Sequence, residues 1–186
     1  MHLATTASAG GTLNLDRDAD DVAGSLSVTA TSDADTDVEA KVAQGVGGST
    51  VGVGASVAVA SAWQRTVAEL ADGAVVAPTT GVGGTISITA TGTHDSSATA
   101  EAAAAASGVA VAGFAATTVS NVSTSARIGT GAALSIGADL SLAATQTAGA
   151  LATARGTVTG NTAAVGAGLA LVLADRRLPW RAAPAR

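Results

Sequence analysis

Apolar and polar residues alternate with a period of two along much of the chain. Residues 26–31 read Leu-Ser-Val-Thr-Ala-Thr, and runs of the same pattern occupy residues 86–91 and 140–145. Successive side chains of a strand point to opposite faces of a sheet, so this period places the apolar residues of each run on one face. Glycine pairs such as Gly10-Gly11 and Gly83-Gly84 bound the runs as turns. The pattern therefore predicts strands.

The three runs repeat at spacings of 60 and 54 residues. Extended without a gap, the offset of 114 between the first and third copies also superposes residues 51–54 on 165–168. Residues 66–70 correspond to 124–128, and each segment is followed by a Gly-Ala turn. The predicted organisation is a partial repeat or cap over 1–25, repeat 1 over 26–85, repeat 2 over 86–139, a truncated repeat 3 over 140–174 and a non-repeat tail over 175–186.

Composition determines how such strands can pack. The chain has 47 Ala, whereas Val, Leu, Ile and Phe together number 38, too few for a conventional core. Stacked strands can instead bury small side chains in thin layers. We therefore expect an all-β fold, a parallel β-helix or β-solenoid built from 54–60-residue repeats, with the right-handed winding that parallel crossovers favour. Two or three rungs per unit would give a stack about 30–40 Å long.

Two uncharged segments admit a different interpretation. Residues 102–106 are all Ala and favour helix by intrinsic propensity, but the equivalent positions Val42 and Thr157 in the other copies favour strand. Residues 102–116 and 163–174 also leave open an Ala/Gly-rich membrane-inserting protein. Because both are shorter than the about 20 residues that span a bilayer, we expect their Ala, Gly and Val side chains to pack inside the solenoid.

The charge distribution bears on partners. Residues 1–175 carry 14 acids and 5 bases, a net charge of −9, while four arginines lie in the last eleven positions. A nucleic-acid partner is not expected, since phosphate binding requires a clustered cationic surface. The chain has no cysteine, which removes disulfides and thiolate metal sites.

Alternating aspartates suggest one candidate metal site. Asp16, Asp18 and Asp20 resemble the oxygen ligands that open a calcium loop. The sixth position is Asp21 instead of the glycine of such loops, and the twelfth is Ser27 instead of a bidentate Glu. A solvated acidic turn is the alternative, and no other cofactor is expected.

Two further groups of polar residues are candidates for chemistry. The four acids at positions 33, 35, 37 and 39 share one face of a predicted strand, where water is expected to solvate them. His94-Asp95 is expected in a solvent-exposed turn. A hydrolase on a β-helix scaffold is a further alternative, but a catalytic triad needs three convergent groups, and we expect no catalysis.

The repeat pattern stops after Leu173, where the sequence becomes Asp-Arg-Arg-Leu-Pro-Trp-Arg. One interpretation is a basic amphipathic tail that docks on a membrane or an acidic partner. The other is unselected sequence that follows an interrupted repeat array. The second is favoured because Pro179 and Pro184 neither extend a strand nor sustain a helix.

The sequence Gly-Val-Gly-Ala-Ser-Val-Ala-Val at 52–59, followed by residues 66–70 and 83–91, resembles the leukotoxin-like strand repeats of large exported bacterial surface proteins, within the filamentous-haemagglutinin and autotransporter-passenger class. The resemblance covers residues 10–174. It implies a structural or adhesive segment of a secreted or outer-membrane-anchored cell-surface protein. Implied partners are host or neighbouring-cell surface molecules and flanking repeats of a larger chain. End-to-end association with a second copy is expected for a different reason, because the truncated third repeat leaves its last rung uncovered. The first residues show no basic or continuous apolar region, so no signal peptide is expected on this chain.

Overall fold

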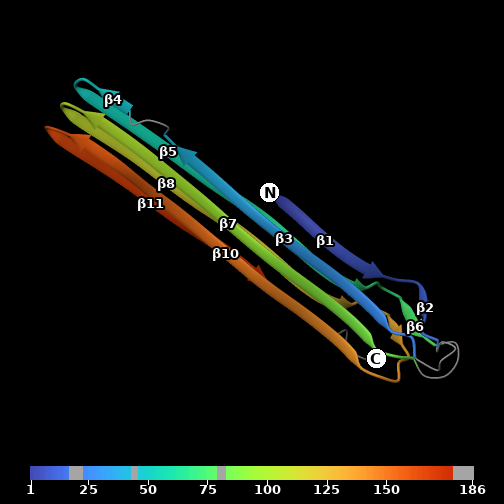
Figure 1. The fold of residues 1–186 in the computed structure, drawn as a ribbon. Helices are drawn as coiled ribbons and strands as arrows, with labels where there is room; N and C mark the ends of the chain where they lie inside the picture. The colour runs from blue at the N-terminus through green and yellow to red at the C-terminus, as the bar shows by residue number, and fades with distance from the viewer. Residues whose placement is uncertain (17–22, 43–45, 79–82, 178–186) are drawn as a thin grey trace.

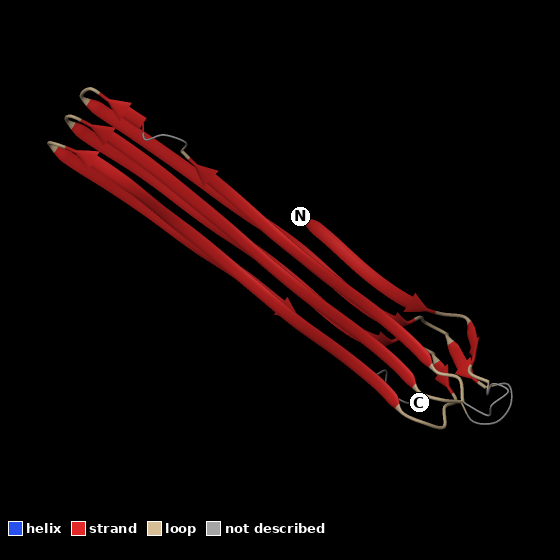
Figure 2. Ribbon diagram, viewed as in Figure 1, coloured by secondary structure: helices blue, strands red, loops and turns tan. Residues whose placement is uncertain are grey.

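The computed structural model describes residues 1–16, 23–42, 46–78 and 83–177. Every regular element in these ranges is a β-strand (Figure 2), which confirms the all-β prediction, including strand at residues 102–106. The strands are β1 (His2–Ala9), β2 (Thr12–Asn14), β3 (Leu26–Lys41), β4 (Val46–Gly48), β5 (Val51–Leu70), β6 (Val75–Ala77), β7 (Ile86–Ala106), β8 (Val109–Ile128), β9 (Ala133–Leu134), β10 (Leu140–Gly160) and β11 (Ala163–Arg177).

The strands form three parallel sheets that the chain visits in a fixed order. Sheet 1 contains β1, β5, β8 and β11; sheet 2 contains β3, β7 and β10, with β4 beside β7; sheet 3 contains the short strands β2, β6 and β9. The chain passes from β5 to β6 to β7 and repeats this path through β8, β9 and β10. Figure 1 shows the long strands side by side, with the short strands of sheet 3 at one end and β4 at the other. Each repeat is one coil of a β-solenoid.

The long dimension of the molecule follows the strands and not the stack. β5 and β8 have 20 residues, and β7 and β10 have 21, which corresponds to about 65–70 Å. Three or four strands about 4.8 Å apart span only about 10–15 Å. The expectation of two or three rungs per unit is therefore wrong. The expectation fails because it assigns the polar residues after each strand motif to a turn, whereas in the structure they continue the same strand.

The three copies of the strand motif are stacked residue on residue in sheet 2. Ile86 pairs with Leu26 on one side and with Leu140 on the other. In sheet 1, Thr66 pairs with Thr124, as the correspondence of residues 66–70 with 124–128 predicted. Stacked turns follow: Gly73 and Gly131 both adopt positive φ, 68° and 73°, the conformation that glycine adopts without steric cost.

One part of the predicted register is wrong. Val53 pairs with Val111, and Val111 pairs with Val165, so the first and third copies are here offset by 112 residues and not by 114. The offset changes between β3 and β4. Lys41 pairs with Glu101 and Val46 pairs with Ala104, so five positions of the first copy correspond to three positions of β7. A slip of two residues keeps every side chain on its original face.

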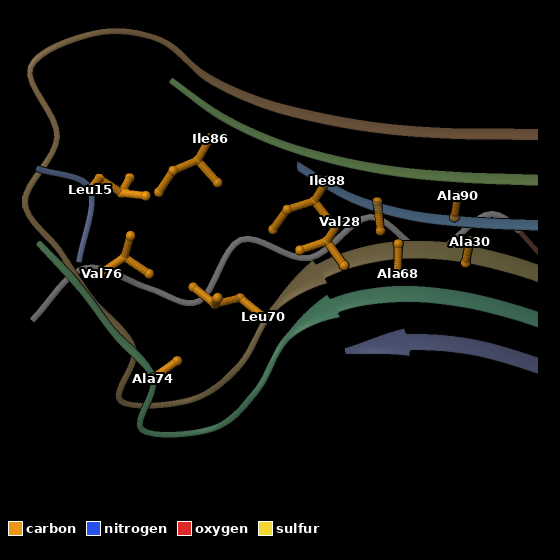
Figure 3. Packing of buried hydrophobic residues seen from close by; sticks show 11 residues of the cluster. Leu15, Val28, Ala30, Ala68, Leu70, Ala74, Val76, Ile86, Ile88 and Ala90 are labelled. Atoms are coloured by element: carbon orange, nitrogen blue, oxygen red, sulfur yellow. The ribbon is translucent and has the colours of Figure 1, made fainter. Parts of the chain in front are cut away.

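The larger buried side chains gather where the three sheets meet. Leu70, Val76, Ile86 and Ile88 are fully buried, and Figure 3 shows them in one cluster with Leu15. Farther along sheets 1 and 2, the fully buried members of the two other clusters are all alanines. The cluster at the sheet 3 end therefore contains branched side chains, and the other two clusters consist of alanine; outside the clusters, Val122 is also fully buried.

Val109, Val111 and Val165 are exposed on the outer face of sheet 1, which contradicts the expectation that the valines of residues 102–116 and 163–174 pack inside. The valines of β5 face the same way. On β5, the glycines, serine and alanines at even positions 52–60 are buried, and the valines at 51, 53, 57 and 59 are exposed. The cause is the closeness of sheet 2: a side chain at Gly54 would meet the backbone oxygen of Ala103 on β7. At this position only a small residue fits between the sheets, and the neighbouring valines point outward. In the next inward row the ring of Phe114 is accommodated by Gly156 and Gly168.

Candidate functional site

The outer face of sheet 2 carries rows of hydroxyl groups. Paired residues of parallel strands point to the same side, so the ladder partners of β3, β7 and β10 form rows across the sheet. Three of these rows are Ser27, Ser87 and Ser141; Thr29, Thr89 and Ala143; and Thr31, Thr91 and Thr145. Hydroxyl donors and acceptors therefore recur about every 4.8 Å across this face.

The acidic row on β3 lies on the same outer face, as its spacing of two predicted. Asp33, Asp35, Asp37 and Glu39 are all exposed. Asp37 accepts a hydrogen bond from Ser97 Oγ at 2.5 Å, and Lys41 forms an ion pair with Glu39. Asp35 lies beside Asp95 on the ladder, so this edge of the face is negatively charged.

The candidate calcium ligands are only partly within the described structure. Asp16 is exposed, and its backbone oxygen accepts a hydrogen bond of 3.2 Å from Gly24 N. Asp18 and Asp20 lie outside the described residues, so a calcium site there stays a prediction. Within the described ranges, no group of three or more His, Asp or Glu side chains is arranged to hold a metal ion.

His94 lies inside the solenoid, so the expectation of an exposed turn is wrong. It occupies the middle of β7, is 0% exposed, and pairs on the ladder with Ala34 and Ala148. Small partners on both sides leave room for the imidazole. The Thr-Gly-Thr-His-Asp sequence at 91–95 resembles a turn. In the structure it is part of β7, and its residues point alternately inward and outward like the rest of the strand.

His94 belongs to a buried polar layer between sheets 1 and 2. The position of a Cβ on Gly92 would lie 2.9 Å from His94 Nε2 and 2.5 Å from Thr124 Oγ1, so the missing side chain makes space for both groups. Several enclosed polar atoms have no hydrogen-bond partner among the described protein groups; they belong to Ser32, Gln64, Thr66, His94, Ser96, Thr124 and Gln146.

Burial lowers the pKa of His94 below its ordinary value of 6.5, and the charges of Asp33 and Asp95 oppose this shift. The unfolded chain therefore binds a proton more readily than the folded protein does. We expect stability to be lost as the pH falls below about 6.5, with a slope of at most about 1.4 kcal/mol per pH unit. Urea unfolding at a series of pH values between 5 and 7.5 would measure this slope.

His94→Gln should remove this pH dependence because glutamine does not titrate. The matched control is His2→Gln, since His2 is the other of the two histidines and is exposed. The control should keep the wild-type slope. An unchanged slope in His94→Gln would show that another group is responsible.

Strand pairing brings together one aromatic pair that the sequence did not suggest. His2 and Trp63 are ladder partners, and their rings are stacked with centroids 4.8 Å apart and an interplanar angle of 4°. A shallow cavity of about 370 Å³ beside them is also lined by Arg65, Asn121 and Ser123. The stacked rings and the adjacent polar groups can contact a ligand that has both an apolar face and hydrogen-bonding groups.

The sequence after Leu173 continues the last strand for a short distance. Asp175, Arg176 and Arg177 still pair with residues 121–123 of β8, and Arg177 Nε donates to Asp175 Oδ2 at 3.0 Å. Residues 178–186 lie outside the described structure, so both interpretations of the tail stay open.

The two Ala-rich segments that suggested membrane insertion are strands in β7, β8 and β11. Among the described residues, no helix is long and apolar enough to cross a membrane. Comparisons of the chain with protein-family models, curated proteins and solved structures found no match.

Proposed function

We propose that the chain is a structural or adhesive β-solenoid segment of a large secreted or cell-surface bacterial protein, in the leukotoxin-like, filamentous-haemagglutinin and autotransporter-passenger class. The in-register stacking of three copies of one strand motif supports this proposal, because a stack of coils is an extensible scaffold that presents flat faces. The proposal includes no catalysis. His94, the candidate base of a catalytic triad, is enclosed between the sheets.

The partners follow from the faces and edges of the sheets. In the described residues, β3 and β10 each have a neighbouring strand on one side only, and open strand edges pair readily with further strands. Flanking repeats of a larger chain, or a second copy in end-to-end association, would pair there. A host or neighbouring-cell surface molecule would lie against the hydroxyl rows of sheet 2.

Display of the chain on a non-adherent bacterium tests the adhesive role. We expect the displayed chain to increase bacterial attachment to an epithelial cell layer severalfold. The triple variant Thr31→Ala, Thr91→Ala and Thr145→Ala removes one complete hydroxyl row and should reduce that attachment. Surface labelling with an antibody would verify equal display of both forms.

A control triple variant changes exposed threonines elsewhere: Thr6→Ala, Thr12→Ala and Thr130→Ala. It should attach as the wild type does. Equal attachment of bacteria with and without the displayed chain would contradict the adhesive role. An equal loss in both triple variants would show that the hydroxyl row is not the contact surface.

A further inference from the structure

The outer face of sheet 1 is apolar over about half of its length. We call it the valine face: residues 51–61 of β5, 109–119 of β8 and 163–173 of β11, at outward positions. Its most exposed side chains are 43–66% exposed; they are Val51, Val53, Val57, Val59, Val165, Leu169, Leu171 and Leu173. No charged residue lies on it. The equivalent face of sheet 2, by contrast, carries serine, threonine and acidic residues.

The valine face is large enough for a specific interface. Eleven residues along three strands cover about 35–40 Å by 14 Å, or about 500–550 Å². This is at the upper end of the apolar patches that monomeric proteins expose, and patches of this size are often functional. Two such faces packed together would bury about 1,000–1,100 Å² or more, which is the area that a specific interface needs.

We propose that the valine face packs against the same face of a second copy of this chain, with the strands of the two copies antiparallel. The resulting dimer is a sandwich of two flat sheets, which normally pack with their strands within about 30° of one another. A two-fold axis across the strands, between the row of Ala55 and the row of Val57, superposes the two apolar areas completely.

The sizes of the side chains favour this arrangement. The axis places Ala55 opposite Val57 of the second copy, and Ala167 opposite Leu169 of the second copy. A row of small residues thus faces a row that contains larger ones, as close packing between sheets requires. Val53 lies opposite Val59 of the second copy by the same symmetry.

Charge favours the antiparallel over the parallel two-fold arrangement, although the ion pair of Arg177 with Asp175 reduces the difference. Arg65 and Arg177 lie in one outward row, just beyond the apolar area. A parallel dimer reverses the order of the strands and places Arg65 over Arg177 of the second copy. The antiparallel dimer instead leaves this charged row beyond the interface, in water, and avoids the repulsion.

A lipid surface fits the valine face less well than a second copy does. In the described residues, the strand edges that border the face have a ladder partner on one side only, over residues 51–60 of β5 and along β11. Unpaired backbone groups in a hydrocarbon environment cost several kcal/mol each, whereas in a dimer these edges stay hydrated. The negative charge of residues 1–175 also opposes binding to anionic lipid.

Sedimentation velocity tests the dimer with two matched variants. Leu169 and Leu151 are 60% and 59% exposed, but Leu169 lies on the valine face and Leu151 on the outer face of sheet 2. We expect the wild-type chain to dimerise at micromolar concentration and Leu169→Asp to weaken dimerisation by about 100-fold or more, because it places an unpaired carboxylate in the interface. Leu151→Asp should dimerise as the wild type does, and circular dichroism should show the same strand content in all three proteins.

Cross-linking tests the orientation, since the chain has no cysteine of its own. A mixture of Val53→Cys and Val59→Cys chains should form a disulfide-linked dimer, and Val53→Cys mixed with Val165→Cys should not. The opposite result would overturn the antiparallel arrangement.

Three other results would overturn the proposal. They are a monomeric wild type at high micromolar concentration, equal weakening by both Asp variants, and binding of a monomer to phosphatidylcholine vesicles that Leu169→Asp abolishes. End-to-end association through strand edges would instead give a series of larger oligomers that Leu169→Asp leaves intact. The dimer and the end-to-end association of the proposed function are thus distinguishable.

Discussion

Val76→Asp is expected to unfold the protein in neutral buffer. Val76 is 0% exposed and lies in the branched-chain cluster with Leu70 and Ile86, where the three sheets meet. An aspartate there would bury a carboxylate without a partner, which costs several kcal/mol. Because the other two clusters consist of alanine, no other cluster compensates for this loss. Far-ultraviolet circular dichroism and urea unfolding would measure the effect.

The adjacent residue provides the control. Val75 belongs to the same short strand but is 39% exposed, so Val75→Asp should change the free energy of unfolding by no more than about 0.5 kcal/mol. Similar destabilisation by both variants would show that sheet 3 does not cover a core. A folded Val76→Asp protein would contradict the packing in Figure 3.

Gly156→Ala is expected to destabilise the protein by about 1–3 kcal/mol, because the new methyl group would overpack the interior. Phe114 is the only Phe of the chain, and its ring lies across the interior from β10. The position of a Cβ on Gly156 would lie 2.6 Å from Phe114 Cε1. In a Phe114→Ala background the same change should cost less but not become neutral, because the ring is gone while the backbone oxygen of Ala102 still lies 2.6 Å from that Cβ position.

A double-mutant cycle measured by urea unfolding would test this contact. Phe114→Ala alone should cost about 2–3 kcal/mol, below the range for a fully buried Phe, because Phe114 is only partly buried. Gly47→Ala is the control, since a Cβ there would meet nothing within 4 Å. Equal effects of Gly156→Ala with and without Phe114 would contradict the contact.

The strands and their stacking could be predicted from the sequence for a clear physical reason. Alternation with a period of two and repeated motifs both report directly on a parallel ladder, where equivalent residues lie side by side. The pairing of Ile86 with Leu26 and Leu140 follows from the repeat alone. The two-residue change of offset between β3 and β4 could not be predicted, because it leaves the alternation intact.

The facing of sheet 1 could not be predicted because both sets of alternating residues are apolar. In the Val-Gly-Val-Gly segment at 51–54, the sequence favours the valines as core residues. The inward position 54, however, lies so close to the backbone of Ala103 that only glycine fits there. The position of His94 was missed for a related reason. The sequence alone does not show that a polar residue such as His94 points inward, because the room for it comes from small ladder partners on neighbouring strands.

The candidate sites depended on tertiary structure to different degrees. The acidic row on β3 was predicted correctly because residues two apart share a face. The His2–Trp63 pair was not predicted, because its residues are 61 positions apart and are joined only by the pairing of β1 with β5.

The central claim is that each repeat forms one coil, so that equivalent residues of successive repeats are neighbours. Spin labels at Ser87→Cys and Ser141→Cys test this most directly, because these residues are ladder partners about 4.8 Å apart across the sheet. The control pair is Ser87→Cys with Leu151→Cys, about 33 Å apart along the strands. Dilution with unlabelled chain removes contacts between molecules. Strong dipolar broadening of the electron paramagnetic resonance spectrum in the first pair and none in the control is the predicted result; no broadening in the first pair would contradict the one-coil repeat.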